Sequence, residues 1–279
     1  LMTSTDKKQA PAILKQPAPN EAFTLITGGS HGIGRAMAEE CARRGYPLLL
    51  VALDDHLLPQ AANELREAYG VAVDTLGIDL TAPDAPRQVY DWCRRRGYQV
   101  GHLINNAGFG RGGLFENHDL QEYISMMRLN NEAVVALTHH FLPMLRTHPR
   151  ARILNMSSME ATLPLPYKTV YTGTKNFIYA FSLALREELK ESDVRVSVLC
   201  PGPVLTNDDG LQRIEAQGKR SQLLLMMPEQ VAPIAIRGML DGKAVIIPGR
   251  LPWWFMKLGK VFPTAPKMRV LERIFRRYK

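Results

Sequence analysis

Apolar runs and segments of helical spacing alternate along most of the chain. We interpret the apolar runs as strands at 23–27, 48–53, 71–79, 102–107, 151–158, 194–200 and 244–248. The segments between them repeat apolar residues at three- and four-residue steps, which predicts helices at 33–45, 56–70, 86–97, 122–145, 171–190 and 229–240. Continuous apolar strands separated by helices are typical of a parallel sheet covered on both faces. We therefore expect a single doubly wound α/β domain over 21–250, with a seven-stranded parallel sheet and helices on both faces.

The two ends of the chain differ from this pattern. Residues 1–20 are polar and rich in Pro, Ala and Lys, and we expect a disordered lead-in rather than a signal peptide. Residues 253–279 hold eight Lys or Arg and one acid, Glu272, so they supply most of the net charge of +8. We interpret 251–279 as a basic amphipathic C-terminal extension. No apolar run reaches the roughly 18 residues that a spanning helix needs.

Composition excludes several classes of function. The three cysteines, Cys41, Cys93 and Cys200, lie far apart, so they predict neither a disulfide framework nor a metal site. Unpaired cysteines indicate a reducing compartment, so we expect a cytoplasmic protein. Contact of the C-terminal tail with the inner membrane surface remains an alternative. The basic charge is confined to that tail and no nucleic-acid-binding signature is present, so we expect no nucleic-acid partner.

Ligands of parallel sheets bind outside the carboxyl ends of the strands, and short motifs follow several of the predicted strands. The glycines of "TGGSHGIG" at 27–34 allow a tight turn and the approach of a pyrophosphate to a helix N-terminus. A merely tight turn is the alternative. Asp79, before Leu80, is placed to accept from an adenine amino group, or else to begin a helix. The remaining motifs are "NNAG" at 105–108, "SS" at 157–158 and "PGPVLT" at 201–206.

Taken together and in register, these motifs resemble the classical short-chain dehydrogenase/reductase family. The matching pieces run from 23 to 248 and include "YTGTK" at 171–175, with Ser158 thirteen residues before Tyr171. The basic, apolar C-terminus is similar to that of a bacterial branch of broad reductases. The resemblance implies a Rossmann-type fold and a dinucleotide held by Thr27, Gly28, Ser30, His31, Gly32, Ile33, Gly34, Asp54, Asp79, Leu80, Asn106, Ala107, Gly108, Tyr171, Lys175, Pro201, Gly202, Val204 and Thr206.

The same resemblance implies a catalytic set of Asn130, Ser158, Tyr171 and Lys175. Tyr171 and Lys175 are one helical turn apart, so their side chains face the same way. A free phenol has a pKa of about 10, and a neighbouring ammonium, with a positive nicotinamide ring, is expected to lower it so that Tyr171 can exchange a proton with a substrate oxygen. Ser158 is expected to steady that oxygen. By resemblance, Lys175 also holds the nicotinamide ribose and Asn130 holds a water.

Each assignment has an alternative in the sequence. Tyr171 and Lys175 also suit an ordinary helix surface. Ser157 competes with Ser158, and Asn131 competes with Asn130; the spacing to Tyr171 and the "LNNEA" context favour Ser158 and Asn130. Tyr167, four residues before Tyr171, is either a substrate-facing neighbour or a packing residue.

Two departures from the family pattern bear on specificity. The family usually has glycine two residues past the Ser158–Met159 pair, whereas this chain has Glu160 and Ala161 there, and Glu160 either disfavours anionic substrates or points outward. After the second strand the chain has Asp54 and Asp55 instead of the arginine of NADP-binding relatives. These acids would accept from a ribose 2′-hydroxyl and repel a 2′-phosphate, although His31 and Arg35 partly offset them. We therefore expect NAD(H) or NADP(H) as cofactor and favour NAD(H).

These observations predict an NAD(P)(H)-dependent oxidoreductase that interconverts a small-molecule carbonyl and its alcohol. The segment 207–227 ends in "LLLMM", which indicates either an apolar lid for a hydrophobic substrate or packing on the core. A catalytically idle dinucleotide-binding scaffold or sensor is the second interpretation, and a membrane-surface adaptor is the third. In the tail, Met268, Leu271, Ile274 or Phe275, and Tyr278 recur on one helical face, which suits either an interfacial membrane anchor or packing on the protein. The resemblance also implies a homo-oligomer, a dimer or tetramer.

Overall fold

The computed structural model describes residues 22–205, 225–249, 252, 254 and 264–276, so the expected lead-in at 1–20 lies outside the described residues. The centre of the structure is a seven-stranded sheet in the order β3-β2-β1-β4-β5-β6-β7, and every pairing is parallel. The strands are β1 Phe23–Thr27, β2 Leu48–Ala52, β3 Val73–Gly77, β4 Val100–Asn105, β5 Arg152–Met156, β6 Arg195–Leu199 and β7 Val245–Ile246. The predicted parallel sheet is confirmed.

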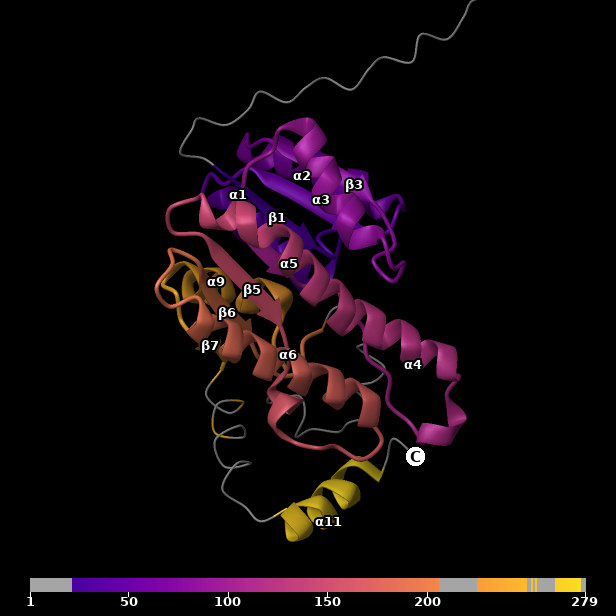
Figure 1. Cartoon of the computed structure of the whole chain (residues 1–279). Coiled ribbons are helices and arrows are strands. Elements are labelled where there is room, and N and C mark those ends of the chain that lie inside the picture. The colour runs from indigo at the N-terminus through magenta and orange to yellow at the C-terminus, as the bar shows by residue number, and fades with distance from the viewer. Residues whose placement is uncertain (1–21, 206–224, 250–251, 253, 255–263, 277–279) are drawn as a thin grey trace, which may run out of the picture.

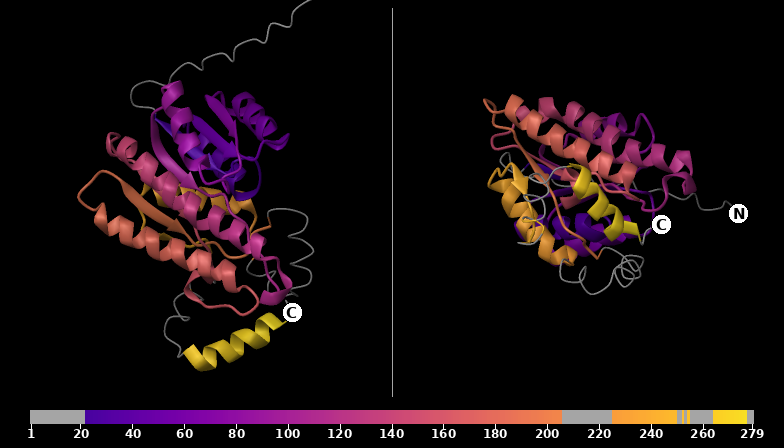
Figure 2. Two further views of the ribbon diagram at one scale, coloured as in Figure 1. Left: turned by 45° about the vertical axis from the view of Figure 1, so that its right-hand side comes forward. Right: turned by 90° about the horizontal axis from the view of Figure 1, so that it is seen from below.

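Helices cover both faces of this sheet (Figures 1 and 2). They are α1 Gly32–Arg43, α2 Leu57–Tyr69, α3 Ala85–Arg96, α4 Leu120–Met127, α5 Ala133–Arg146, α6 Thr169–Glu188, α9 Pro228–Leu240 and α11 Thr264–Phe275. Helices α1, α2 and α9 pack on one face of the sheet, and α3, α5 and α6 pack on the other. The predicted doubly wound arrangement is therefore confirmed.

Strand β2 shows why the strands are apolar throughout. All five of its residues are buried, and successive side chains point to opposite faces of the sheet. Leu48 and Leu50 pack in the cluster with α1 and α2, whereas Leu49 and Val51 pack in the cluster with α3 and α5. An alternating polar pattern would leave polar groups buried under one layer of helices, so both positions have to be apolar.

The predicted helix at 122–145 is interrupted in the structure. Helices α4 and α5 are joined by a π-helical turn, η2, at Arg128–Glu132. Some predicted strands are also shorter than expected: β7 has two residues, and β3 covers the middle of the predicted 71–79. No helix within the described residues is both long enough and apolar enough to cross a membrane.

The strand order fixes where a ligand site lies. Strand β1 pairs with β2 on one side and with β4 on the other, so the chain reverses its direction of winding at β1. Loops on either side of this point leave opposite faces and open a crevice at the carboxyl ends of the strands. The loops after β1, β4, β5 and β6 all begin at this edge.

Candidate active site

The loop between β1 and α1 is braced by the segment that follows β4. Thr27 Oγ1 accepts hydrogen bonds from the backbone N–H groups of Asn106 and Ala107, both at 3.0 Å. The Asn106 side chain donates to the backbone oxygens of Thr27 at 3.0 Å and Gly28 at 3.2 Å. Thr27 and Asn106, both predicted to hold the cofactor, therefore lie together and fix the shape of the loop.

Two glycines in this loop have no room for a side chain. Gly28 has φ of +66°, and a Cβ on Gly34 would lie 1.9 Å from the Gly28 carbonyl oxygen. Helix α1 begins at Gly32, and its first turn, which is fully described, contains no acidic residue and has no side-chain cap from His31. Its free N–H groups and positive dipole end suit an anion, so the loop fits the pyrophosphate of a dinucleotide.

Asp54, Asp55 and Asp79, which we expected near the adenosine half of the dinucleotide, have different roles in the structure. Asp55 Oδ1 accepts from the backbone N–H groups of Leu57 and Leu58 and so caps α2. Asp54 is exposed and lies beside the end of β3, where a Cβ on Gly77 would be 2.7 Å from its carboxylate. This leaves Asp54 as the better candidate for a ribose hydroxyl. Asp79 is exposed and accepts from Thr81 N at 2.8 Å, and Leu80 is buried.

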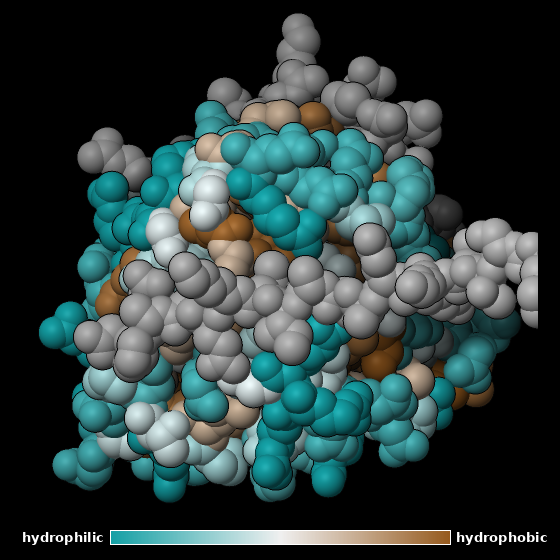
Figure 3. Space-filling view, turned by 90° about the horizontal axis from the view of Figure 1, so that it is seen from above, coloured by the Kyte–Doolittle hydropathy of each residue, from teal (hydrophilic) through white to brown (hydrophobic). Residues whose placement is uncertain are grey.

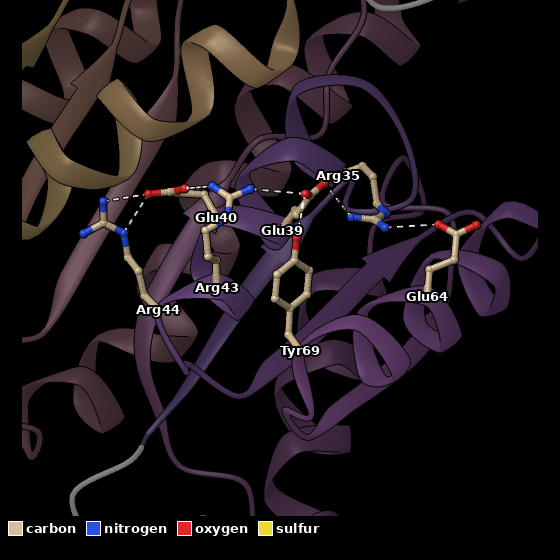
Figure 4. Close-up of polar contacts among 7 residues, drawn as sticks. All are labelled: Arg35, Glu39, Glu40, Arg43, Arg44, Glu64 and Tyr69. Atoms are coloured by element: carbon tan, nitrogen blue, oxygen red, sulfur yellow. Dashed lines mark hydrogen bonds and ion pairs between the residues drawn. The ribbon is translucent and has the colours of Figure 1, made fainter.

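Arg35, one of the two residues expected to offset these acids, is held in an ion-pair network (Figure 4). Its guanidinium lies 3.1 Å from Glu64 on α2 and 3.6 Å from Glu39 on α1. The network continues through Arg43, Glu40, Arg44 and Tyr69. Two carboxylates therefore compensate the charge of Arg35. His31 is exposed, with its Nδ1 3.1 Å from Ser30 Oγ.

Tyr171 and Lys175 lie on the same side of α6, at its N-terminal end. Lys175 is only 5% exposed, its Nζ is 5.8 Å from the centre of the Tyr171 ring, and it donates to the Met156 carbonyl at 3.2 Å. Burial lowers the pKa of Lys175 to about 8. Burial, assisted by the nearby Glu160 carboxylate, raises the pKa of Tyr171, and a hydrogen bond from Ser158 opposes this. The expected lowering of the Tyr171 pKa is therefore absent here, because desolvation dominates.

The two serines after β5 point in different directions. Ser157 Oγ donates to the Lys175 carbonyl at 2.8 Å, which anchors α6 to the strand end. Ser158 Oγ accepts from Glu160 N at 3.1 Å, and its hydroxyl is close enough to the Tyr171 phenol to oppose the rise in the pKa of Tyr171. Of the two, it is Ser158 that shares the site with Tyr171, as the spacing predicts.

Asn130 is buried in the π-helical turn between α4 and α5. Its amide accepts from Phe109 N at 3.1 Å and donates to Phe109 O at 2.9 Å and Thr174 Oγ1 at 3.1 Å. Asn131 instead donates to the Thr174 carbonyl. A Cβ on Gly108 would lie 2.7 Å from Asn130 Oδ1 and 3.5 Å from Lys175 Nζ, so these three residues converge. π-Helical turns are frequent at functional sites.

The segment after β6 closes the same edge of the sheet. The Pro201 carbonyl accepts from Met159 N at 2.9 Å, and Gly202 and Val204 are half-buried. Met226 pairs with Val204 and packs on the core. Met226 therefore follows the packing alternative, whereas Met227 is 42% exposed, and Thr206 and most of 207–227 lie outside the described residues.

Three contacts at the site were missed by sequence reasoning. Thr174 holds Asn130, as described above. Gly110 lies against Tyr171, where a Cβ would be 2.6 Å from the ring, and the glycine-rich run at 108–113 was the available signal. Lys168 pairs with Glu160 at 2.8 Å, so the carboxylate that departs from the family pattern is compensated. Neither the residue types nor their spacing predicts the ion pair of Lys168 with Glu160.

Comparison with known proteins gives the same family along most of the chain. Residues 22–215 match the family model for short chain dehydrogenase. The chain is 32% identical to very-long-chain 3-oxoacyl-CoA reductase of Macaca fascicularis over 264 residues, which cover 90% of this chain and 83% of the relative. It is also 32% identical to the Mus musculus enzyme of that name over 197 residues, which cover 68% of this chain and 62% of that protein.

Solved structures agree. A short-chain dehydrogenase from Sphingobium yanoikuyae in complex with NADPH has a TM-score of 0.73 and 29% identity, covering 88% of this chain and 97% of that one. A short-chain dehydrogenase/reductase from Burkholderia phymatum in complex with NAD has a TM-score of 0.75 and 25% identity, covering 86% of this chain and 92% of that one. This chain belongs to the short-chain dehydrogenase family.

Proposed function

We propose that this chain is an NAD(P)(H)-dependent oxidoreductase that interconverts a carbonyl and its alcohol. The observation that carries the proposal is the convergence of Ser158, Tyr171 and Lys175 beside a glycine loop that fits a pyrophosphate. The named relatives are reductases, and the solved structures hold NADPH or NAD, which supports the same cofactor class.

Each residue of this set has a distinct task in carbonyl reduction. The nicotinamide, when bound, supplies the hydride to the carbonyl carbon. Ser158 donates a hydrogen bond to the carbonyl oxygen and steadies its developing charge. Tyr171 donates its phenol proton to that oxygen, which completes the alcohol. Lys175, still an ammonium below a pH of about 8, then returns a proton toward the tyrosinate.

The protonation state of Tyr171 in the free protein is the one that the reductive direction needs. Because burial raises the pKa of Tyr171, the phenol keeps its proton at neutral pH and is ready to donate it. Oxidation of an alcohol needs the opposite state, a tyrosinate. We therefore propose that reduction is the direction the free protein is prepared for.

We propose a hydrophobic carbonyl substrate. The two mammalian relatives are named for very long acyl chains, and apolar residues of the tail helix pack close to this end of the site. Lys168 compensates Glu160, so an anionic group on the substrate meets no isolated carboxylate at this point.

The test is turnover by the purified full chain. NADH and NADPH are each supplied with a panel of ketones that includes long-chain 3-oxoacyl thioesters, and cofactor oxidation is followed. Turnover that is lost in Tyr171→Phe supports the enzyme. Tight cofactor binding without turnover of any ketone would instead support the idle scaffold or sensor.

For the tail we propose packing on the domain as the main role. Met268, Leu271 and Phe275 face Leu163 and Leu165, which occupies the face that a membrane anchor would use. Val270 and Ile274 lie on the outer side of α11, and both are at least half exposed. The surface of the molecule on the side opposite α11 is largely hydrophilic (Figure 3). Cosedimentation with anionic and neutral vesicles, using the full chain and a version ending near Pro252, tests what membrane contact remains.

We also propose a homo-oligomer, dimer or tetramer, in a reducing, cytoplasmic compartment. Exposed apolar side chains on the long helices, Val135 on α5 and Phe177 on α6, support self-association. The three cysteines are buried and free, which supports the compartment. Light scattering of the full chain over a range of concentrations measures the oligomeric state.

A further inference from the structure

Helix α11 packs on the segment that connects Ser158 to Tyr171, two of the proposed catalytic residues. We call the part of the substrate site lined by this segment its mouth. The segment 163–168 runs from η3 (Met159–Thr162), which follows Ser158, to the start of α6, which carries Tyr171. Leu163, Leu165 and Leu271 are buried together, and Met268 and Phe275 pack against them. In Figure 1 and in the left view of Figure 2, α11 lies at the bottom of the molecule, next to the loop that leads into α6.

A polar contact fastens this packing in one orientation. The Tyr167 hydroxyl donates to Glu272 Oε1 at 3.0 Å. Arg276 donates to both oxygens of the same carboxylate at 2.8 Å, which holds it in place. The Lys168 ammonium lies 5.6 Å from the centre of the Phe275 ring. Apolar contact alone would allow α11 to slide or turn, whereas this hydrogen bond selects one position.

The backbone of Tyr167 is itself held in an unfavourable conformation. Its φ of +64° lies in the left-handed region, which a residue with a bulky side chain rarely adopts. Its carbonyl accepts from Gly113 N at 2.8 Å, in the glycine-rich segment whose Gly110 lies against the Tyr171 ring. A strained residue persists where its surroundings fix it, and such residues cluster at functional sites.

Three segments of the mouth therefore meet at Tyr167 and Lys168. In the segment after β4, Gly113 donates a hydrogen bond to Tyr167. In the segment after β5, Glu160 forms an ion pair with Lys168. On α11, Glu272 accepts a hydrogen bond from Tyr167. The Lys168 carbonyl also accepts from Thr172 N, the residue after Tyr171. A displacement of Tyr167 would move the walls on both sides of the catalytic phenol.

We propose that α11 positions the mouth of the substrate site, and that Glu272 is the positioning residue, acting through Tyr167. The inference rests on the proposed function. A small ketone reacts at Ser158 and Tyr171 without reaching the segment 163–168. A long apolar ketone extends past these residues, so its affinity depends on where this segment is held. The contact therefore sets KM for long substrates and leaves the chemical step unchanged.

The experiment compares variants of the full chain on a short methyl ketone and a long-chain 3-oxoacyl thioester. Glu272→Ala and Tyr167→Phe each remove the hydrogen bond, and each should raise KM for the long substrate roughly fivefold with kcat and the short substrate unchanged. The double variant should match the single ones, because both remove the same contact. Glu272→Gln keeps an acceptor oxygen and should behave as the parent. Val270→Ala, on the exposed side of α11, is the matched control.

The opposing results are distinct. Unchanged KM in both single variants, or an equal rise on both substrates, would overturn the positioning role. A parent chain that reduces no ketone would instead defeat the proposed function. In that case hydrogen exchange at the amides of Gly113, Leu163, Leu165, Tyr167 and Lys168 decides the coupling: faster exchange in Glu272→Ala than in Val270→Ala supports it, and equal exchange overturns it.

Discussion

The Lys175 ammonium lies 5.8 Å from the centre of the Tyr171 ring, one turn further along α6. Burial acts on the two groups in opposite directions: it lowers the pKa of Lys175 to about 8 and raises the pKa of Tyr171. The phenol therefore holds its proton more tightly than the ammonium does. Transfer of a proton from Lys175 toward a tyrosinate is downhill, which makes the pair suited to supply protons to a substrate oxygen.

The first prediction is a pH dependence of ketone reduction. The rate should fall as pH rises through about 8, where Lys175 loses its proton, while Tyr171 keeps its own over the same range. In Lys175→Arg the guanidinium stays charged, so the residual activity should show no fall in this region. The measurement is kcat/KM against pH, with circular dichroism to verify folding. A fall at the same pH in Lys175→Arg would assign it to another group.

The second prediction concerns cofactor preference. Asp54 is exposed at the end of β2, and Glu39 and Glu64 compensate Arg35, so NAD should bind more tightly than NADP. Asp54→Asn should tighten NADP binding by about tenfold, because the repulsion of a 2′-phosphate is removed. Asp55→Asn, which keeps the cap of α2, is the matched control and should shift the preference less. Dissociation constants that favour NADP in the parent would contradict this assignment.

The third prediction concerns stability in acid. His102 on β4 is buried near His148 and Tyr46, and burial lowers its pKa to about 4 from an ordinary 6.5. As pH falls below 6.5, His102 becomes protonated in the unfolded chain but stays neutral in the folded protein. The free energy of unfolding therefore decreases between pH 6.5 and about 4. The loss from this group over the whole range is about 3 kcal/mol.

Urea unfolding at about pH 7 and about pH 4.5 measures this loss. His102→Gln should reduce the difference in unfolding free energy between the two pH values. His56→Gln changes an exposed histidine and should leave that difference as in the parent. An undiminished acid loss in His102→Gln would show that other groups are responsible.

The sheet could be predicted from sequence because each strand is a local apolar run. Strand β2, buried at all five positions, is the clearest example. The π-helical turn at Asn130 was not predicted, because a single extra residue per turn leaves the apolar spacing of the helix nearly unchanged. The length of β7 depends on its edge pairing with β6, which is a tertiary contact.

The candidate site was predictable where motifs stand in a fixed register: Ser158 follows the end of β5, and Tyr171 and Lys175 lie one turn apart at the start of α6. Spacing also separated Ser158 from Ser157, and the structure shows the physical reason: Ser157 is used to anchor α6. For the free protein, the predicted direction of the Tyr171 pKa shift was wrong, because a nearby charge can be inferred from spacing but the extent of desolvation cannot. Glu272 and Tyr167 are 105 positions apart in the sequence, so no local pattern predicts their hydrogen bond.

The central claim is that the Tyr171 hydroxyl carries the proton in catalysis. The most direct measurement is turnover by Tyr171→Phe, with cofactor affinity measured on the same preparation. Our account predicts that turnover falls by about 10²- to 10⁴-fold while the cofactor dissociation constant stays close to the parent value, since only the hydroxyl is removed. Near-normal turnover by Tyr171→Phe would contradict it.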